Sequence, residues 1–350
     1  MTFAKKMIGT ALCAGAAMFT LSSSAAVFPL KSDDMGLTHR YRTKDHATGA
    51  NQGLGKDITA VRPTGGNDWS NLVSDNADST VNSNHLIYGK KVYAMVSGTV
   101  VNCWRNAPEN AQAGTKDADV LNFYIGVGGN HVLIRTDDGI LVEHAHMIPG
   151  SISSAICPNN KTRFDNPSSS TQPGEANVTN GAHITKGQYL GLAGNSGNST
   201  GPHVHVHMIK DNAPFAMPIE HGQTTPFTNG ETPTTGPWTL LKGNALPSGN
   251  ILIWAPRSTG NWTVNNVSSA GFQGWFNHMT DSGQMPENLQ CTSGGDFYNT
   301  DWVPSKGSWI AKAGMSATEL ANQTNTLAMQ GFYQYKWWYC GSVRSAIWRK

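Results

Sequence analysis

Charged residues are scarce in this chain, and neither sign prevails. Asp, Glu, Lys and Arg make up 14% of the 350 residues, with 25 basic and 23 acidic side chains, whereas about a quarter is usual in soluble domains. Two lysines, Lys5 and Lys6, lie in an amino-terminal segment that we expect to be removed, and without them the two signs are equal. This balance excludes nucleic acid or an anionic membrane surface as a partner recognised by bulk charge.

Long apolar runs are also lacking, apart from one at the amino terminus. The run from Met7 to Leu21 follows two lysines and precedes the small residues from Ser22 to Ala26. This is the pattern of a secretory signal peptide, which we place at residues 1–26. No later run reaches the length that a membrane-spanning helix needs. We therefore expect a mature protein without an integral membrane segment, secreted or periplasmic.

Cysteine is rare, and one of the five cysteines lies in the expected signal peptide. The other four allow three pairings; they are Cys103, Cys157, Cys291 and Cys340. The first two lie in a histidine-rich half and the last two in a tryptophan-rich half, so we favour Cys103 with Cys157 and Cys291 with Cys340. An oxidising compartment disfavours free thiols and thiolate metal ligands.

The rest of the chain predicts a mainly β protein with two parts. Residues 27–230 contain short strand patterns separated by long polar loops, and we expect a compact antiparallel β-sheet domain there. Residues 231–250 are rich in Thr, Pro and Gly and are typical of a linker. Residues 251–350 hold eight of the eleven tryptophans and predict a small α+β module. Its helix should begin at a capping box of Ser316 and Glu319 and end at Gly331.

Two interpretations of the tryptophan-rich module remain open. Aromatic side chains dominate the cores of small modules, so the tryptophans are explained by packing. Exposed indole rings also stack on sugars, so the alternative is a surface that binds the cell wall. The module bears a weaker resemblance to a bacterial tandem-repeat domain, in which a helix ending near Gly-Tyr/Phe is followed by a strand closing with Trp.

Histidines alternate with valines from His203 to His207 behind a glycine-rich approach. Successive side chains of a strand point to opposite faces, so His203, His205 and His207 line one wall. Imidazole nitrogens are zinc ligands and proton carriers. No serine nucleophile elbow, phosphate loop or nucleotide fingerprint occurs in a supporting context. The chemistry of the chain therefore centres on these histidines.

Several ordered motifs carry a resemblance to a known family. They are Val92-Tyr93-Ala94 with Gly98-Thr99-Val100, His144-Ala145-His146-Met147, Gly187-Gln188, the run 194–202, and His203-Val204-His205. Together they resemble the lysostaphin-like zinc endopeptidases, which cut peptidoglycan peptides. The match spans roughly residues 46–210. It implies a compact antiparallel β-fold with a zinc-bearing groove.

The resemblance also implies the site residues. A zinc ion would be held by His205, Asp57 and a further histidine upstream. Lysostaphin-type members place that histidine four residues before the Asp, where this chain has Gly53. Staphylolysin and the beta-lytic enzymes use a longer gap, which His46 fits, while His85 and His39 are alternatives.

The remaining histidines near the motifs have other expected roles. His146 and His203 correspond to the family's two catalytic histidines that do not bind the metal. His144 replaces a residue that is usually aromatic in the family, and we expect it to contact substrate or to support the site. His207 shares the metal face but lies one step further along, as a groove residue or a residue behind the ligands.

We therefore expect a monomeric zinc metalloendopeptidase that hydrolyses peptide cross-links of peptidoglycan with a metal-activated water. One alternative is a catalytically degenerate peptidoglycan-binding protein of the same fold, which the irregular position of the first ligand motivates. Another is a zinc peptidase that acts on Gly-rich proteins. The tryptophan-rich module would be an accessory domain.

Overall fold

The computed structural model describes residues 25–36, 39–46, 51–64, 68–167, 174–220, 222–226, 239–241, 243–254, 261–281 and 283–350. The expected signal peptide lies outside these ranges except for its last two residues, and so does the part of the expected linker at 231–238. Strands make up 42% and helices 12%, which confirms a mainly β fold. No helix within the described ranges has both the length and the apolar character needed to cross a bilayer.

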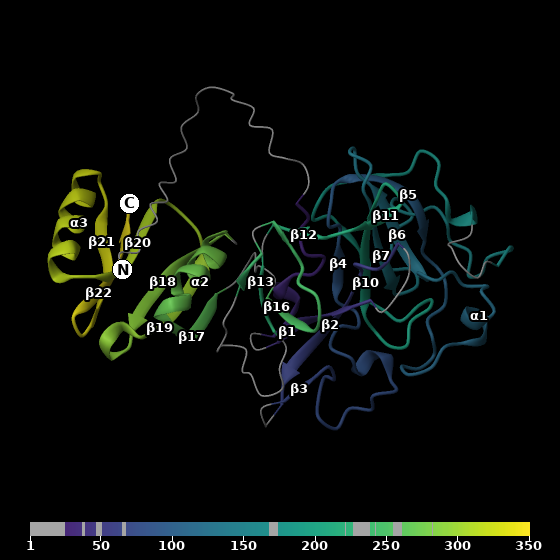
Figure 1. The fold of residues 1–350 in the computed structure, drawn as a ribbon, viewed down its shortest axis with the longest axis horizontal. Coiled ribbons are helices and arrows are strands. Elements are labelled where there is room, and N and C mark those ends of the chain that lie inside the picture. Colours follow the sequence, from purple (N-terminus) through teal and green to yellow (C-terminus); the bar gives the residue numbers. More distant parts are fainter. Residues whose placement is uncertain are drawn as a thin grey trace. The chain divides into compact units, whose positions relative to one another are not determined.

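The chain divides into two compact units, which are coloured purple to green and green to yellow in Figure 1. The described parts of the first unit are residues 25–226 and 241–254, with the gaps given above. Those of the second are residues 239–240 and 261–350.

The first unit consists almost entirely of strands. Its elements are β1 (Arg40–Asp45), β2 (Lys56–Pro63), β3 (Trp69–Ser70), β4 (Lys91–Tyr93), β5 (Gly98–Trp104), α1 (Ala118–Leu121), β6 (Asn130–Arg135), β7 (Leu141–Met147), β8 (His183–Ile184), β9 (Tyr189–Leu192), β10 (Val204–Lys210), β11 (Ala213–Phe215), β12 (Pro218–Ile219), β13 (Gln223–Pro226), β15 (Asn244–Ala245) and β16 (Ile251–Trp254), with short 3-10 turns at Ser32–Asp34, Asn82–Asn84 and Gly174–Ala176.

A large sheet runs through this unit in the order β13-β16-β1-β2-β10-β7-β6-β5-β8. The pairs among these strands are antiparallel. Strands β4 and β9 form a separate two-stranded ribbon. Strand β10 therefore lies between β2 and β7, which are far apart in sequence.

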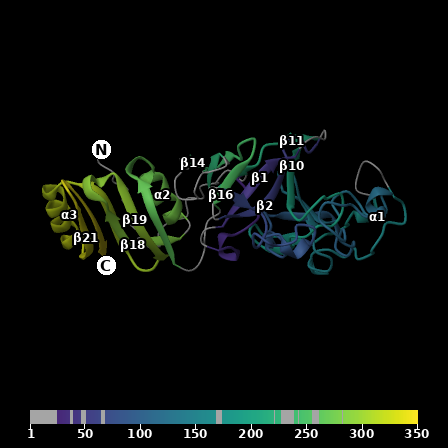
Figure 2. The ribbon, with the colours of Figure 1, turned by 90° about the horizontal axis from the view of Figure 1, so that it is seen from below.

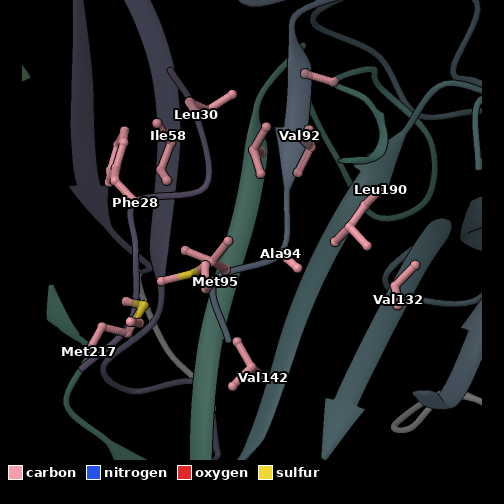
Figure 3. Close-up of a cluster of buried hydrophobic side chains, with 14 of the residues drawn as sticks. Phe28, Leu30, Ile58, Val92, Ala94, Met95, Val132, Val142, Leu190 and Met217 are labelled. Carbon is pink, nitrogen blue, oxygen red and sulfur yellow. The ribbon is translucent and has the colours of Figure 1, made fainter. Parts of the chain in front are cut away.

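Alternation along the strands separates the core from the site. On β2 and β10, the buried apolar side chains include Ile58, Ala60, Val204 and Val206, which belong to the main core cluster. Figure 3 shows this cluster around Met95, with Val92, Val142 and Leu190 nearby. The intervening positions on the same two strands point to the other face. This places the polar side chains of β2 and β10 together.

The structure corrects the expected boundary of the second part. Residues 251–254 form β16, which pairs with β1 and β13 of the large sheet. Ile251 and Ile253 are buried in its core. The Thr, Pro and Gly content of the preceding residues suggested a linker up to residue 250, but the apolar run that follows belongs to the first unit.

The second unit contains the same succession of elements twice. The first set is β17 (Trp262–Ser268), α2 (Ser269–Asp281), β18 (Gln284–Cys291) and β19 (Phe297–Pro304), and the second is β20 (Trp309–Met315), α3 (Ala317–Met329), β21 (Tyr333–Cys340) and β22 (Val343–Arg349), with β14 at Thr239–Leu240 and a 3-10 turn at Ser293–Gly295. Their sheets have the matching orders β17-β19-β18 and β20-β22-β21. Figure 2 shows α3 along the second sheet. The unit is thus built from two β-α-β-β repeats.

Several expectations for individual features hold. Ser316 and Glu319 form the capping box of α3, and Gly331 adopts a φ of 84° just after that helix. Disulfides join Cys103 to Cys157 and Cys291 to Cys340, the favoured pairing.

Four tryptophans of the second unit are buried, namely Trp262, Trp275, Trp302 and Trp348. Packing therefore accounts for at least half of the tryptophans counted in the module.

Candidate metal centre

The register of three strands brings the polar residues together. His205 on β10 is the direct partner of Asp57 on β2 and of Ala145 on β7. His46 follows the last residue of β1, and its backbone N–H donates to the carbonyl oxygen of Gly55 at 3.0 Å. Because β1 pairs with β2, this bond places His46 next to Asp57.

Three side chains present donor atoms that one metal ion can reach. His205 Nδ1 lies 2.9 Å from Asp57 Oδ1, and His46 Nδ1 lies 3.4 Å from the same oxygen. One donor atom from each of the three residues lies within 4.8 Å of the others. Two imidazoles and a carboxylate with a fourth position left open are the donor set of a catalytic zinc. The residues present therefore fit a zinc ion.

The electrostatics of this group favour an anionic Asp57. Burial opposes ionisation of Asp57, but hydrogen bonds from His203, His205 and His46 outweigh it and hold the pKa of the carboxyl well below its usual range. The bond to Asp57 in turn raises the pKa of His46. The centre thus concentrates one negative charge among three imidazole rings, an arrangement that attracts a cation.

His146 and His203 lie beside this group and have the same tautomer. His146 Nδ1 is 2.8 Å from the carbonyl oxygen of Ser196, and His203 Nδ1 is 2.8 Å from that of Gly201. A carbonyl only accepts, so each Nδ1 carries a proton and Nε2 is the nitrogen left to exchange one. His203 Nε2 lies 3.5 Å from Asp57 Oδ1.

The rings of His146 and His203 are 4.5 Å apart between centroids. His146 is buried, and burial together with the nearby His203 and His205 lowers the pKa of His146 well below its usual value. Its backbone adopts a φ of 68°, a conformation that non-glycine residues rarely adopt outside strained or functional positions. A neutral, pre-positioned imidazole can accept or donate a proton at Nε2.

A buried amide holds the loop that positions both rings. Asn110 Nδ2 donates to the carbonyl oxygens of Asn195, Gly197 and Ser199 at 2.8, 3.0 and 3.2 Å. This loop contains the Ser196 carbonyl that holds His146. Asn110 lies in a polar loop and was not singled out from the sequence, because a single Asn in such a loop has no distinguishing pattern.

The other histidines considered as ligands lie elsewhere. His85 contacts Asn71 through Nδ1 and the carbonyl oxygen of Ser79 through Nε2, so both its nitrogens are engaged outside the three-residue group. Among the described residues, the potential metal ligands that come together are His46, Asp57 and His205, so His39 is not part of the group either.

His144 is fully buried and accepts the Met95 backbone N–H at 3.1 Å. That position is among core residues, so the expected contact of His144 with substrate has no support.

No family model matches the chain, and no curated protein matches it by sequence. Among solved structures, the catalytic domain of the antimicrobial peptidase lysostaphin from Staphylococcus simulans is similar at 16% identity, covering 54% of this chain and 94% of that chain, with a TM-score of 0.26. The M23 metalloprotease pseudoalterin from the deep sea is 13% identical over 65% of this chain and 96% of its own, with a TM-score of 0.29. A zinc-containing peptidase from Vibrio cholerae is 13% identical over 46% and 48%, with a TM-score of 0.22. At these TM-scores the likenesses carry no conclusion about the activity of this chain.

Proposed function

We propose that this chain is a secreted zinc metalloendopeptidase that hydrolyses peptide cross-links of bacterial peptidoglycan. The observation that carries the proposal is the convergence of five side chains from separate parts of the sequence. His46, Asp57 and His205 form the donor group, and His146 and His203 lie beside it with Nδ1 held by backbone carbonyls. A protein that only binds the cell wall has no need for this arrangement.

The proposed chemistry divides between the metal and the histidines. When bound, zinc would act as a Lewis acid toward the scissile carbonyl and the attacking water. Of His146 and His203, one would take the proton of the water at Nε2. The other would stabilise the negative charge on the substrate oxygen or return a proton to the leaving amine. The Nδ1 bonds to backbone carbonyls keep both rings oriented during these transfers.

The choice of substrate rests on the sequence motifs. Their resemblance to lysostaphin-like enzymes supports peptidoglycan peptides, and the same motifs leave a Gly-rich protein as a second candidate. The test is digestion of purified peptidoglycan, followed by mass analysis of the fragments. New amino termini at a defined cross-link bond are expected. Cleavage of a Gly-rich protein with intact muropeptides would instead favour the second candidate.

The metal is tested on the same preparation. The mature protein should carry about one zinc per chain, and Asp57→Ala and His205→Ala should each lose most of it. His46→Ala should lose zinc affinity as well. The matched control is His85→Ala, which removes an imidazole of the first unit that contacts none of the three ligands. Full zinc occupancy in both the Asp57 and His205 variants would contradict the ligand assignment.

The second unit is proposed to contact the cell wall. Its strand β21 leaves Tyr333, Trp337 and Tyr339 largely exposed, and the rings of Trp337 and Tyr339 meet edge to face at 4.3 Å between centroids. Exposed aromatic rings with polar edges suit both sugar rings and peptides. An accessory role would raise the local substrate concentration without taking part in the reaction.

A further inference from the structure

A buried polar pair lies behind the proposed ligand His205. His207 and Glu143 are direct cross-strand partners on β10 and β7. His205 and His207 are each 3% exposed and Glu143 is 9% exposed. Because His205 and His207 are two residues apart on one strand, they share a face. The sheet register thus brings Glu143, His207 and His205 together in that order.

With a metal ion on His205 Nδ1, the distances give these groups one consistent order of protons. A metal ligand at His205 Nδ1 needs its lone pair there, so the ring carries its proton on Nε2. That nitrogen lies 2.9 Å from His207 Nδ1, to which it then donates. His207 therefore carries its own proton on Nε2, 3.5 Å from Glu143 Oε2. An ionised carboxylate only accepts, so Glu143 favours this order over the reverse.

Gly55, just before β2, lies next to the same two histidines. A Cβ atom at this position would lie 3.2 Å from His205 Cε1 and 3.2 Å from His207 Cβ. A side chain at this position would crowd both histidines, so the glycine leaves the space that the pair occupies.

We propose that Glu143 and His207 are positioning residues that fix the tautomer and ring orientation of His205, so that Nδ1 presents its lone pair to the metal. The proposal rests on the proposed zinc site. Partners of this kind, behind a metal-bound histidine, typically change metal affinity by about 10–100-fold. The alternative is a buried polar pair that stabilises β7 and β10 without acting on the metal.

The test measures zinc affinity by chelator competition in two matched pairs of variants of the full mature chain. His207→Phe keeps a ring but removes both nitrogens, whereas His207→Asn keeps an acceptor near the position of Nδ1. Glu143→Leu removes the carboxylate, whereas Glu143→Gln keeps an acceptor oxygen. We expect zinc binding to weaken about 10–100-fold in the Phe and Leu variants and by much less in the Asn and Gln variants.

Three further measurements separate positioning from stability. If Glu143 acts through His207, the double variant His207→Phe/Glu143→Leu should bind zinc no more weakly than His207→Phe alone. The visible spectrum of the cobalt-substituted protein should shift in His207→Phe and return toward wild type in His207→Asn. His144→Gln is the control: it replaces a buried histidine of β7 that contacts Met95, and it should leave zinc affinity unchanged.

The outcomes distinguish this proposal from the proposed function. If the wild-type chain binds zinc and the Phe and Leu variants bind it equally tightly while melting at lower temperature, the pair is structural and the positioning role is overturned. If the Phe variant does not fold, the Leu and Gln variants at position 143 decide the question. If the wild-type chain binds no zinc, both proposals fail together. If zinc binds as expected but peptidoglycan is not cleaved, only the proposed function fails.

Discussion

Two backbone carbonyls determine what His146 and His203 can do. Ser196 and Gly201 hold the Nδ1 protons, so proton transfer can occur only at Nε2. We predict that His146→Ala and His203→Ala each retain zinc but lose about 100-fold or more in turnover, as removal of a general acid, base or oxyanion stabiliser usually does. Zinc content and cleavage of a soluble peptide are measured together.

The control for this pair is His183→Ala, which removes an exposed imidazole on β8. It should match the wild type in both measurements. Near-normal turnover in either the His146 or the His203 variant would exclude that residue from the mechanism. Loss of zinc in either variant would instead move it into the ligand set.

His144 gives a pH dependence whose sign is fixed by its environment. Burial lowers the pKa of His144 to about 4, against about 6.5 in an unfolded chain. Between these values the unfolded state binds more protons, so the free energy of unfolding falls as the pH is lowered through this window. The limiting slope is about 1.4 kcal/mol per pH unit, and below pH 4 the contribution stays constant.

His144→Gln removes this titration and keeps an acceptor for the Met95 backbone N–H. We predict that the variant loses less stability than the wild type between pH 6.5 and 4, measured by denaturant unfolding at several pH values. Other buried histidines, such as His131, titrate in both proteins and cancel in the comparison. Equal pH slopes would mean that His144 is not held neutral by burial.

At the scale of elements, the loop 194–201 depends on Asn110. Asn110→Ala removes the side-chain donor that three carbonyls share. The carbonyls of Asn195 and Gly197 keep the backbone N–H groups of Asn110 and Ser199, whereas the Ser199 carbonyl loses its donor, which costs about 1–3 kcal/mol. We predict lower stability and a larger fractional loss of turnover, because the Ser196 carbonyl that holds His146 is in this loop. Zinc content should be unchanged, since the proposed ligands lie on other segments.

The matched control is Asn159→Ala. Asn159 also donates to two carbonyl oxygens, those of Cys103 and Ala176, but neither belongs to the loop beside the histidines. It should lower the melting temperature and leave turnover per folded molecule unchanged. Equal turnover losses in the two variants would show that the effect is general destabilisation.

The sequence predicted those elements whose pattern is local. The strand that contains His205 and His207 and the capped helix α3 follow from alternation and capping residues. Helix α2 was not predicted, because Gly271 and Gly274 lower helix propensity. Its buried residues nevertheless have helical spacing, at positions 272, 275, 276 and 279, and this signal was available in the sequence.

The candidate site was predictable only in part, for a physical reason. His203 immediately precedes β10 and His205 lies on it, so their relation is local. His46 and Asp57 meet because β1 pairs with β2 in a particular register, which spacing alone does not fix. The Asn110 and Glu143 contacts depend on pairing between distant segments, and backbone carbonyls such as that of Ser196 have no side-chain signature at all.

At the scale of the whole molecule, β16 is the last strand of the first unit. A chain that ends at residue 255 keeps this strand, whereas one that ends at residue 249 exposes β1 and β13 and loses the burial of Ile251 and Ile253. Each buried Ile contributes about 1.5–3 kcal/mol. We predict that the longer chain folds and binds zinc, and that the shorter one is strongly destabilised, as measured by melting temperature and zinc content.

The longer truncated chain also tests the second unit. If that unit contacts the cell wall, its removal should weaken cosedimentation with peptidoglycan while barely changing cleavage of a small soluble peptide, because only the local substrate concentration changes. Trp337→Ala in the full chain should reproduce part of the loss, and Trp302→Ala should instead unfold the unit, since Trp302 is fully buried. If the truncated chain binds peptidoglycan as well as the full chain, the tryptophans serve only to pack the core of the second unit. If the truncated chain aggregates, the first unit does not fold independently.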